Sequence, residues 1–186
     1  MKLSLLICGL EERLEIRNKL YKQIADQYDE ALVEVITELD NGEMSIGDKR
    51  NKLLERAQGE YVAFIDDDDE ISSHYIDELL NAIKMKPDCC SLRGIITTDG
   101  KDGQIFEHSI KYKAYKTNSP TEGIRYVRFP NHLNCIKASI AKQFKFPSIN
   151  HGEDTDWATQ IFKSGLLKDE AYIPDVIYHY NYITNK

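Results

Sequence analysis

The fold of this chain can be worked out from one stretch, YVAFIDDDD at residues 61–69, in which an apolar run ends in four consecutive carboxylates. The five β-forming residues at its start predict a buried strand, and open α/β sheets bind their ligands at the carboxyl ends of such strands. Two carboxylates about 4 Å apart repel by roughly 1 kcal/mol in water and roughly 4 kcal/mol at an effective dielectric of 20. The run must therefore be solvated, partly protonated or occupied by a cation, and its place at a strand end favours the cation.

Side chains along a strand alternate between its two faces. Asp66 and Asp68 are therefore expected on one face, and Asp67 and Asp69 on the other. This alternation predicts that the four carboxylates do not share one environment.

Around this strand, strand-like and helix-like segments alternate. Apolar runs predict further strands at residues 3–8 and 32–37, before the strand at 61–65. Helical spacing of apolar residues predicts three helices, over 11–28, over 48–57 and between Ser73 and Pro87. This order predicts an α/β fold with a parallel sheet flanked by helices.

The pattern changes after Cys89. Residues 90–98 and 104–110 predict two strands joined by turns, and residues 111–128 predict an irregular excursion over the site. Further on, the sequence predicts short helices at 138–144 and 157–164 and terminal strands at 172–174 and 176–182. The second half is therefore expected to be mixed or antiparallel rather than parallel.

Composition excludes several classes of protein. Of the 186 residues 41% are hydrophobic and 30% charged, which is typical of a soluble globular protein, and the net charge of -7 argues against broad nucleic-acid binding. No stretch reaches the roughly 18 apolar residues of a membrane span, and the start is too short for a secretion signal, so a cytoplasmic location is expected. The cysteines lack metal-binding spacing and are expected to be reduced and mostly buried; they are Cys8, Cys89, Cys90 and Cys135.

Acidic residues recur at the ends of predicted elements. Asp40 follows the second strand, residues 66–69 follow the third, and Glu153, Asp154 and Asp156 open the last helix. Hard cations such as Mg²⁺ or Mn²⁺ take oxygen ligands, and Mg²⁺ is usually held by one or two carboxylates together with substrate phosphates. The sequence therefore predicts a metal–diphosphate site rather than a closed metal cage.

Three motifs occur together with the expected separation: GDKRN at 47–51, AQGEYVAFIDDDD at 57–69 and GEDTD at 152–156. With them the sequence resembles the GT-A-type glycosyltransferases of the large inverting group called family 2. The resemblance implies a GT-A (Rossmann-like) fold, with a mostly parallel central sheet flanked by helices and a small mixed or antiparallel acceptor-side portion. It also implies one domain over 1–186, in which 1–98 bind the nucleotide sugar and 99–186 form the acceptor-side half.

On the nucleotide side, the resemblance implies that Asp40 contacts the base and that Arg50 borders the nucleotide pocket. Asp67 and Asp69 are assigned to the turn or to contacts with the donor.

For the metal, the resemblance implies that Asp68 binds a Mn²⁺ or Mg²⁺ ion that bridges the diphosphate, and that Asp66 lies beside it on the ribose side. His179 resembles the C-terminal histidine that completes the metal shell, although a histidine between two tyrosines in a strand is as often a packed core residue.

For catalysis, the resemblance implies that Asp154 is the general base, with Glu153 in reserve. A helix cap is the plain alternative for Asp154 and the preferred role for Asp156. Three residues are candidates for contacts with the sugar or acceptor, with the turn or the core as their alternatives; they are Asn131, His132 and Trp157.

The expected activity is that of a hexosyltransferase-like enzyme, which transfers a sugar from a nucleoside diphosphate sugar, preferably a UDP-sugar, to a hydroxyl of a glycan, lipid-linked or other acceptor with inversion. The chain lacks the Gln-x-x-Arg-Trp signature of processive synthases, which favours a single transfer. A nucleotidyltransferase of similar fold and an inactive nucleotide-sugar-binding module are the alternatives. The sequence leaves a homo-oligomer open.

Overall fold

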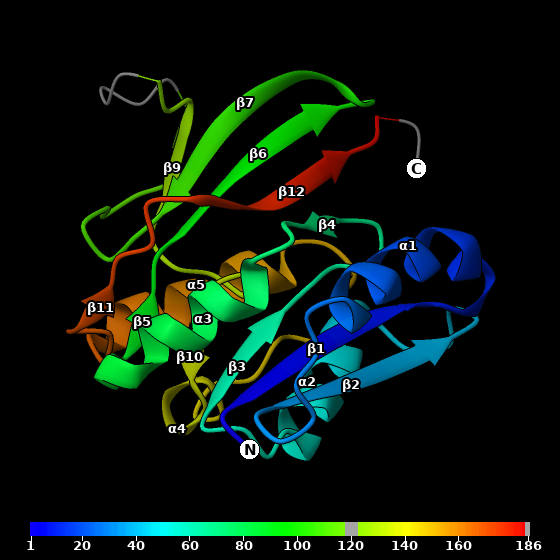
Figure 1. Ribbon diagram of the computed structural model, residues 1–186, viewed down its shortest axis with the longest axis horizontal. Coiled ribbons are helices and arrows are strands. Elements are labelled where there is room, and N and C mark those ends of the chain that lie inside the picture. Colours follow the sequence, from blue (N-terminus) through cyan, green and yellow to red (C-terminus); the bar gives the residue numbers. More distant parts are fainter. Residues whose placement is uncertain (118–122, 185–186) are drawn as a thin grey trace.

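The computed structural model describes residues 1–117 and 123–184 and contains two six-stranded sheets with helices packed around one of them (Figure 1). The first sheet has the strand order β11-β5-β10-β3-β1-β2. Its strands are β1 (Leu3–Leu10), β2 (Val33–Asp40), β3 (Tyr61–Phe64), β5 (Cys89–Cys90), β10 (Ile136–Lys137) and β11 (Glu170–Ala171).

The centre of the first sheet is parallel, as the alternation of strands and helices predicts. β1 pairs in parallel with both β2 and β3, and β10 runs antiparallel to β3. The carboxyl ends of β1, β2 and β3 therefore meet at one edge, where the acidic run follows β3.

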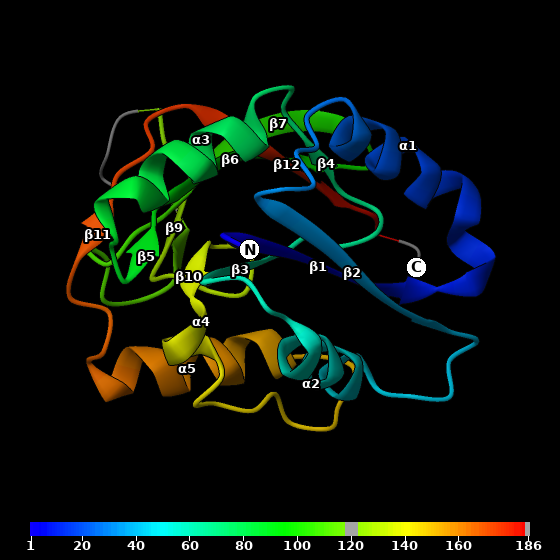
Figure 2. The same ribbon diagram turned by 60° about the horizontal axis from the view of Figure 1, so that its bottom comes forward.

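Helices cover both faces of this sheet (Figure 2). α1 (Leu14–Ala25) and α3 (Tyr75–Ala82) lie on one face, whereas α2 (Ile46–Arg56), α4 (Ala138–Ala141) and α5 (Glu153–Ser164) lie on the other. A short 3₁₀ turn at Glu11–Arg13 precedes α1, and another at Ile83–Met85 follows α3. The helix expected over 11–28 is therefore shorter and starts with a 3₁₀ turn.

The alternation along β3 divides the core into two clusters. Tyr61 and Ala63 pack in the cluster that contains residues of α1 and α3, whereas Val62 and Phe64 pack in the cluster that contains residues of α2 and α5. All four cysteines are buried thiols, as their spacing predicts.

The second sheet has the strand order β4-β12-β6-β7-β9-β8 and is mixed. Its strands are β4 (Glu70–Ile71), β12 (Val176–Tyr182), β6 (Leu92–Thr98), β7 (Lys101–His108), β9 (Tyr126–Arg128) and β8 (Lys116–Thr117). β8 and β9 correct the prediction that 111–128 are irregular throughout, because residues 116–117 and 126–128 pair as strands. Residues 118–122 lie outside the described part of the chain.

The two sheets meet at the acidic run. β4 begins at Glu70, directly after Asp69, and pairs with β12 in the second sheet. The chain thus passes from the first sheet to the second through the four carboxylates. Over 1–117 and 123–184, no helix has both the length and the apolar character that crossing a membrane requires.

Candidate active site

The acidic run divides into two environments, but it does so in a turn rather than by strand alternation, because β3 ends at Phe64 and the N–H of Asp69 donates to the carbonyl of Asp66 at 3.1 Å. The side chains of Asp66 and Asp68 are 24% and 11% exposed, whereas Asp67 and Asp69 are buried. The partly exposed pair is accessible to a ligand, and the buried pair contacts the protein.

Asp66 is held by a buried arginine from α2. Arg50 donates from Nη2 to Asp66 Oδ1 at 2.8 Å, and its Nη1 lies 3.1 Å from Glu153 Oε1 at the start of α5. The guanidinium lies over the rings of Phe64 and Phe146, at 5.8 and 5.6 Å. Burial would raise the pKa of Asp66, but Arg50 and His132 offset this and hold that pKa well below its usual range. Arg50, expected at the border of the nucleotide pocket, therefore joins two acidic motifs.

His132 lies between Asp66 and Asp154. Its Nε2 is 3.5 Å from Asp66 Oδ2 and its Nδ1 is 3.6 Å from Asp154 Oδ2. Asp66 and Asp154, which are far apart in the sequence, thus lie beside the same imidazole ring.

Asp154 lies in the first turn of α5 and does not cap the helix. α5 is preceded by Gly152 at φ 84°, and no side chain caps it, so neither Asp154 nor Asp156 has the capping role that was their alternative. Asp154 is 24% exposed, whereas Glu153 is buried beside Arg50. Burial raises the pKa of Glu153, and Arg50 opposes that shift.

Asp40 lies at the end of β2, on the same edge of the sheet. It forms an ion pair with Lys49, and the backbone N–H groups of Gly42 and Met44 donate to its two oxygens at 3.1 and 2.7 Å. Burial would raise the pKa of Asp40, but these donors lower it. The carboxylate expected to contact the base is therefore fixed in orientation by its own turn.

Asp67 is bound to the connection between β1 and α1. It accepts a hydrogen bond from Arg13 Nη1 at 3.1 Å, and Arg17 Nη1 lies 3.9 Å away. A Cβ atom at Gly9 would overlap the Asp67 carboxylate, so a glycine is required there for this close approach. Burial nevertheless raises the pKa of Asp67, against the charge of Arg13.

Asp69 is bound to β12. It accepts hydrogen bonds from Tyr178 Oη at 2.8 Å and from the backbone N–H of Asn181 at 2.9 Å. Burial and the charge of Asp66 raise the pKa of Asp69 well above its usual range. Asp67 and Asp69 are thus both buried, although Asp69 also lines the cleft that Asp68 faces.

Asp68 faces a cleft of about 320 Å³ between α1 and the turn into β4, and Arg13 Nη1 lies 3.7 Å from its carboxylate. In the β4–β12 register His179 pairs with Glu70, which lies two residues along the chain from Asp68. Within 1–117 and 123–184, no three His, Cys, Asp or Glu side chains are arranged to hold a metal ion. This donor set fits a cation that takes its remaining ligands from a diphosphate, and it does not fit a closed cage.

The remaining candidates lie in a buried turn or in the core. Asn131 is buried, and its Oδ1 accepts a bond from the N–H of Leu133 at 3.1 Å. Trp157 is 1% exposed and stacks on Phe146 with ring centroids 4.7 Å apart, which is the core position that was its alternative.

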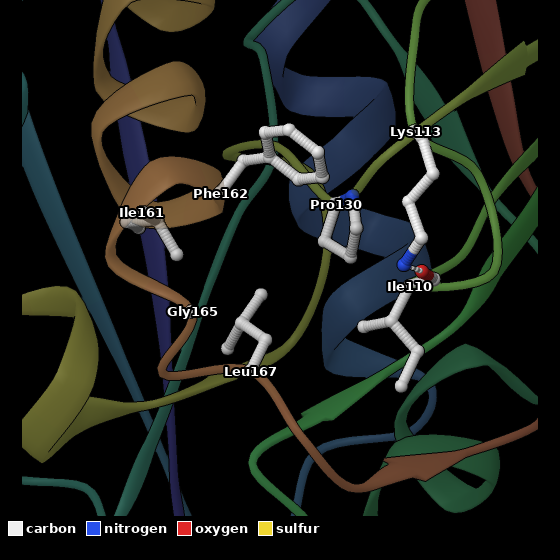
Figure 3. A pocket seen from close by; sticks show the side chains of 7 residues that line it. All are labelled: Ile110, Lys113, Pro130, Ile161, Phe162, Gly165 and Leu167. Carbon is white, nitrogen blue, oxygen red and sulfur yellow. Dashed lines mark hydrogen bonds between the residues drawn. The ribbon is translucent and has the colours of Figure 1, made fainter.

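A second, smaller cavity of about 110 Å³ lies beside α5 (Figure 3). It is lined mainly by apolar side chains such as Phe162 and Pro130, and Lys113 at its edge donates to the carbonyl of Ile110 at 2.9 Å. No carboxylate lines it, so the acidic cluster is the better candidate site.

Sequence reasoning missed Arg13, Arg17 and Lys49. Each is a basic residue that neutralises a strand-end carboxylate through a contact at least nine residues away in the chain. The available signal was the placement of Arg13 and Arg17 four residues apart at the start of a helix, which puts both on one face.

Comparisons with known proteins agree with this geometry. The model of a family described as glycosyl transferase family 2 matches residues 19–146. No curated protein matches the chain.

Solved structures of TarS from S. aureus share the fold. TarS 1–349 in complex with UDP-GlcNAc matches with a TM-score of 0.73 at 15% identity, covering 100% of this chain and 60% of that one. The complex of TarS 1–349 with UDP matches with a TM-score of 0.71 at 15% identity, covering 97% and 60%. The chain thus spans less than two thirds of these structures. The likeness confirms the predicted α/β fold of GT-A type.

Proposed function

The chain belongs to glycosyl transferase family 2, and on that basis we propose that it transfers a sugar from a UDP-sugar to the hydroxyl group of an acceptor. The observation that carries the proposal is the convergence of two motifs on one ring, with Asp66 and Asp154 at 3.5 and 3.6 Å from the nitrogens of His132. The UDP-GlcNAc complex of TarS supports a UDP-sugar as the donor.

The donor would lie across the carboxyl ends of β1, β2 and β3. In this proposal Asp40 meets the base, Asp66 lies toward the ribose and Asp68 toward the diphosphate; the common edge formed by the ends of these strands supports it. Asp68, with help from Asp66, would hold a Mn²⁺ or Mg²⁺ ion. When bound, such an ion offsets the negative charge that develops on the departing diphosphate.

Asp154 is the proposed general base. Its carboxylate takes the proton of the acceptor hydroxyl while that oxygen forms a bond to the anomeric carbon and the bond from that carbon to the diphosphate breaks. Attack from the face opposite the leaving group gives inversion. Glu153 is less suited to this role because it is buried against Arg50, whereas Asp154 is partly exposed.

The proposal is tested with Asp154→Asn and the matched control Asp156→Asn, which removes a charge two residues away on the same helix. We expect Asp154→Asn to bind UDP within about twofold of the wild type but to release UDP from UDP-GlcNAc at least about 100-fold more slowly, because general-base catalysis contributes about 10²–10⁴-fold. Asp156→Asn is expected to keep its rate. The measurements are calorimetry and a UDP-release assay with Mn²⁺ and a panel of UDP-sugars.

Undiminished turnover in Asp154→Asn would show that the base lies elsewhere. A wild-type protein that binds UDP but turns over none of the UDP-sugars, with or without candidate acceptors, would instead indicate a nucleotide-sugar-binding module.

A further inference from the structure

The turn that carries His132 is fixed by its neighbours rather than by the imidazole ring. Asn134 Oδ1 accepts from the N–H of Asn131 at 3.0 Å, and Asn131 Oδ1 accepts from the N–H of Leu133 at 3.1 Å. Asn134 also donates to the carbonyl of Cys90 at 2.9 Å, which ties the turn to β5. The ring of His132 is therefore not needed to close the turn.

His132 is attached to the strand that ends in Asp66. Its carbonyl accepts a hydrogen bond from the N–H of Phe64 at 3.2 Å, and its ring meets the Phe64 ring edge-on at 6.3 Å. Because Phe64 lies two residues before Asp66, the same strand sets the position of the ring and of the carboxylate.

Both ring nitrogens are buried without a hydrogen-bond partner. Leaving a buried polar atom unpaired costs about 1–3 kcal/mol. Yet the nitrogens face Asp66 and Asp154 at 3.5 and 3.6 Å, so a shift of about 0.5 Å would bring each within hydrogen-bonding range. Hydrogen bonds of active sites are often long in the free enzyme and tighten when the substrate binds.

His108 shows what a structural histidine looks like in the same region. It is buried too, but its Nδ1 has a partner, Asn134 Oδ1 at 3.2 Å, and burial lowers its pKa to about 3. In the part of the chain that the structure describes, His108 forms no ion pair with a carboxylate of the candidate site. The two histidines therefore form a matched pair, one with a partner and one without.

We propose that His132 is a positioning residue that couples the donor side of the site to the base, by bridging Asp66 and Asp154 when a nucleoside diphosphate binds. The inference rests on the proposed function for its effect on turnover. In it, the donor draws Asp66 and the ring together, and the ring in turn orients the Asp154 carboxylate toward the acceptor hydroxyl.

The test in turnover compares His132→Phe, which keeps a ring against Phe64, with His132→Gln and the control His108→Phe. We expect His132→Phe to lower kcat for UDP release from UDP-GlcNAc by about 10–100-fold, the usual effect of losing a residue that orients a ligand, with KM within about twofold. His132→Gln, which keeps one donor, is expected to recover part of the loss. His108→Phe is expected to keep kcat within about twofold.

Two results in turnover would overturn the proposal. One is an unchanged kcat in His132→Phe. The other is an equal loss of kcat in His132→Phe and His108→Phe at equal loss of melting temperature, which would make the role structural.

A second measurement needs no turnover. In protein labelled with ¹⁵N at histidine, Asp66→Asn should shift the Nε2 resonance of His132 and Asp154→Asn the Nδ1 resonance, and UDP with the diamagnetic ion Mg²⁺ should shift both. If neither substitution moves either resonance, the bridge does not exist and the inference fails, whether or not a UDP-sugar is turned over. Shifts caused by the substitutions in a protein that does not bind UDP would show the contacts of His132 but contradict both their coupling to a donor and the proposed function.

Discussion

Asp66 and Asp69 lie three residues apart in one acidic run, and their surroundings move their pKa values in opposite directions. Burial favours the neutral form of both, but Arg50 and His132 outweigh it at Asp66 and lower the pKa. At Asp69 burial is reinforced by the charge of Asp66, and the pKa rises. The side of a strand end on which a carboxylate lies thus decides its chemistry.

The same comparison explains how four adjacent carboxylates coexist. Arg50 neutralises Asp66, Arg13 and Arg17 lie beside Asp67, and the raised pKa of Asp69 moves it toward the protonated form. Repulsion within the run is therefore relieved by protein cations and by protonation together. The side that carries Asp66 and Asp68 stays accessible to a ligand.

The largest effect is expected from Asp68→Asn, on the accessible side. Because a bound cation contributes several kcal/mol and 1.4 kcal/mol is tenfold in affinity, we expect Mn²⁺-dependent binding of UDP to weaken by at least about 100-fold. The measurement is calorimetry with UDP, with and without Mn²⁺.

Glu15→Gln is the matched control, since Glu15 lines the same cleft as Asp68 but does not belong to the strand end. It removes one negative charge and is expected to leave Mn²⁺-dependent binding within a few-fold. Equal losses in the two variants would mean that the net charge of the cleft, rather than coordination by Asp68, attracts the cation.

On the buried side, Asp67→Asn is expected to act on stability. It leaves Arg17, which is 1% exposed, beside a neutral amide, but Arg17 keeps its hydrogen bond to the carbonyl of Leu10 at 2.7 Å, and burial already disfavours the charged form of Asp67. The expected cost is therefore about 1–3 kcal/mol, that of a lost partner for a buried polar group. For a chain of this length, each 1 kcal/mol lowers the melting temperature by about 2–4 °C, so a fall of at least about 2 °C is expected in thermal unfolding. If Asp67→Asn lowered the melting temperature by less than Asp68→Asn does, then Asp68 rather than Asp67 would be the carboxylate with the structural role.

Much of the first sheet could be predicted because its signals are local. The strand predicted at 61–65 follows from neighbouring residues, whereas the alternation predicted for Asp66 to Asp69 was wrong because these residues form a turn. The order of strands and helices implies the parallel register that brings Asp40 to the same edge. Motif resemblance, rather than periodicity, indicated that Asp154 belongs with them.

The second sheet and the internal ion pairs could not be predicted in this way. The pairing of β12 with β4 places His179 beside Glu70 and sends Tyr178 to Asp69, and it depends on a register between segments more than 100 residues apart. The contacts of Arg13 and Arg17 with Asp67 likewise require the packing of α1 on the sheet. Such long-range choices leave no periodic trace in the sequence.

The smallest effect is expected in the pH dependence of the stability of Asp69→Asn. It tests the comparison of Asp66 with Asp69 most directly. The pKa of Asp69 is raised by folding, so its stabilising contribution is present below the unfolded value near 3.9 and is lost as the pH rises through the folded value. The wild type should therefore lose up to about 1.4 kcal/mol per pH unit in this window from this group, and Asp69→Asn should not. Asp66→Asn should still lose stability as the wild type does over this window. The reason is that the pKa of Asp66 is lowered, so its contribution to stability is lost only as the pH falls below about 3.9. Urea unfolding from pH 4.5 to 7.5 measures the free energy of unfolding of both variants. If that free energy changed with pH in Asp69→Asn as it does in the wild type, folding would not raise the pKa of Asp69, and the contrast with Asp66 would fail.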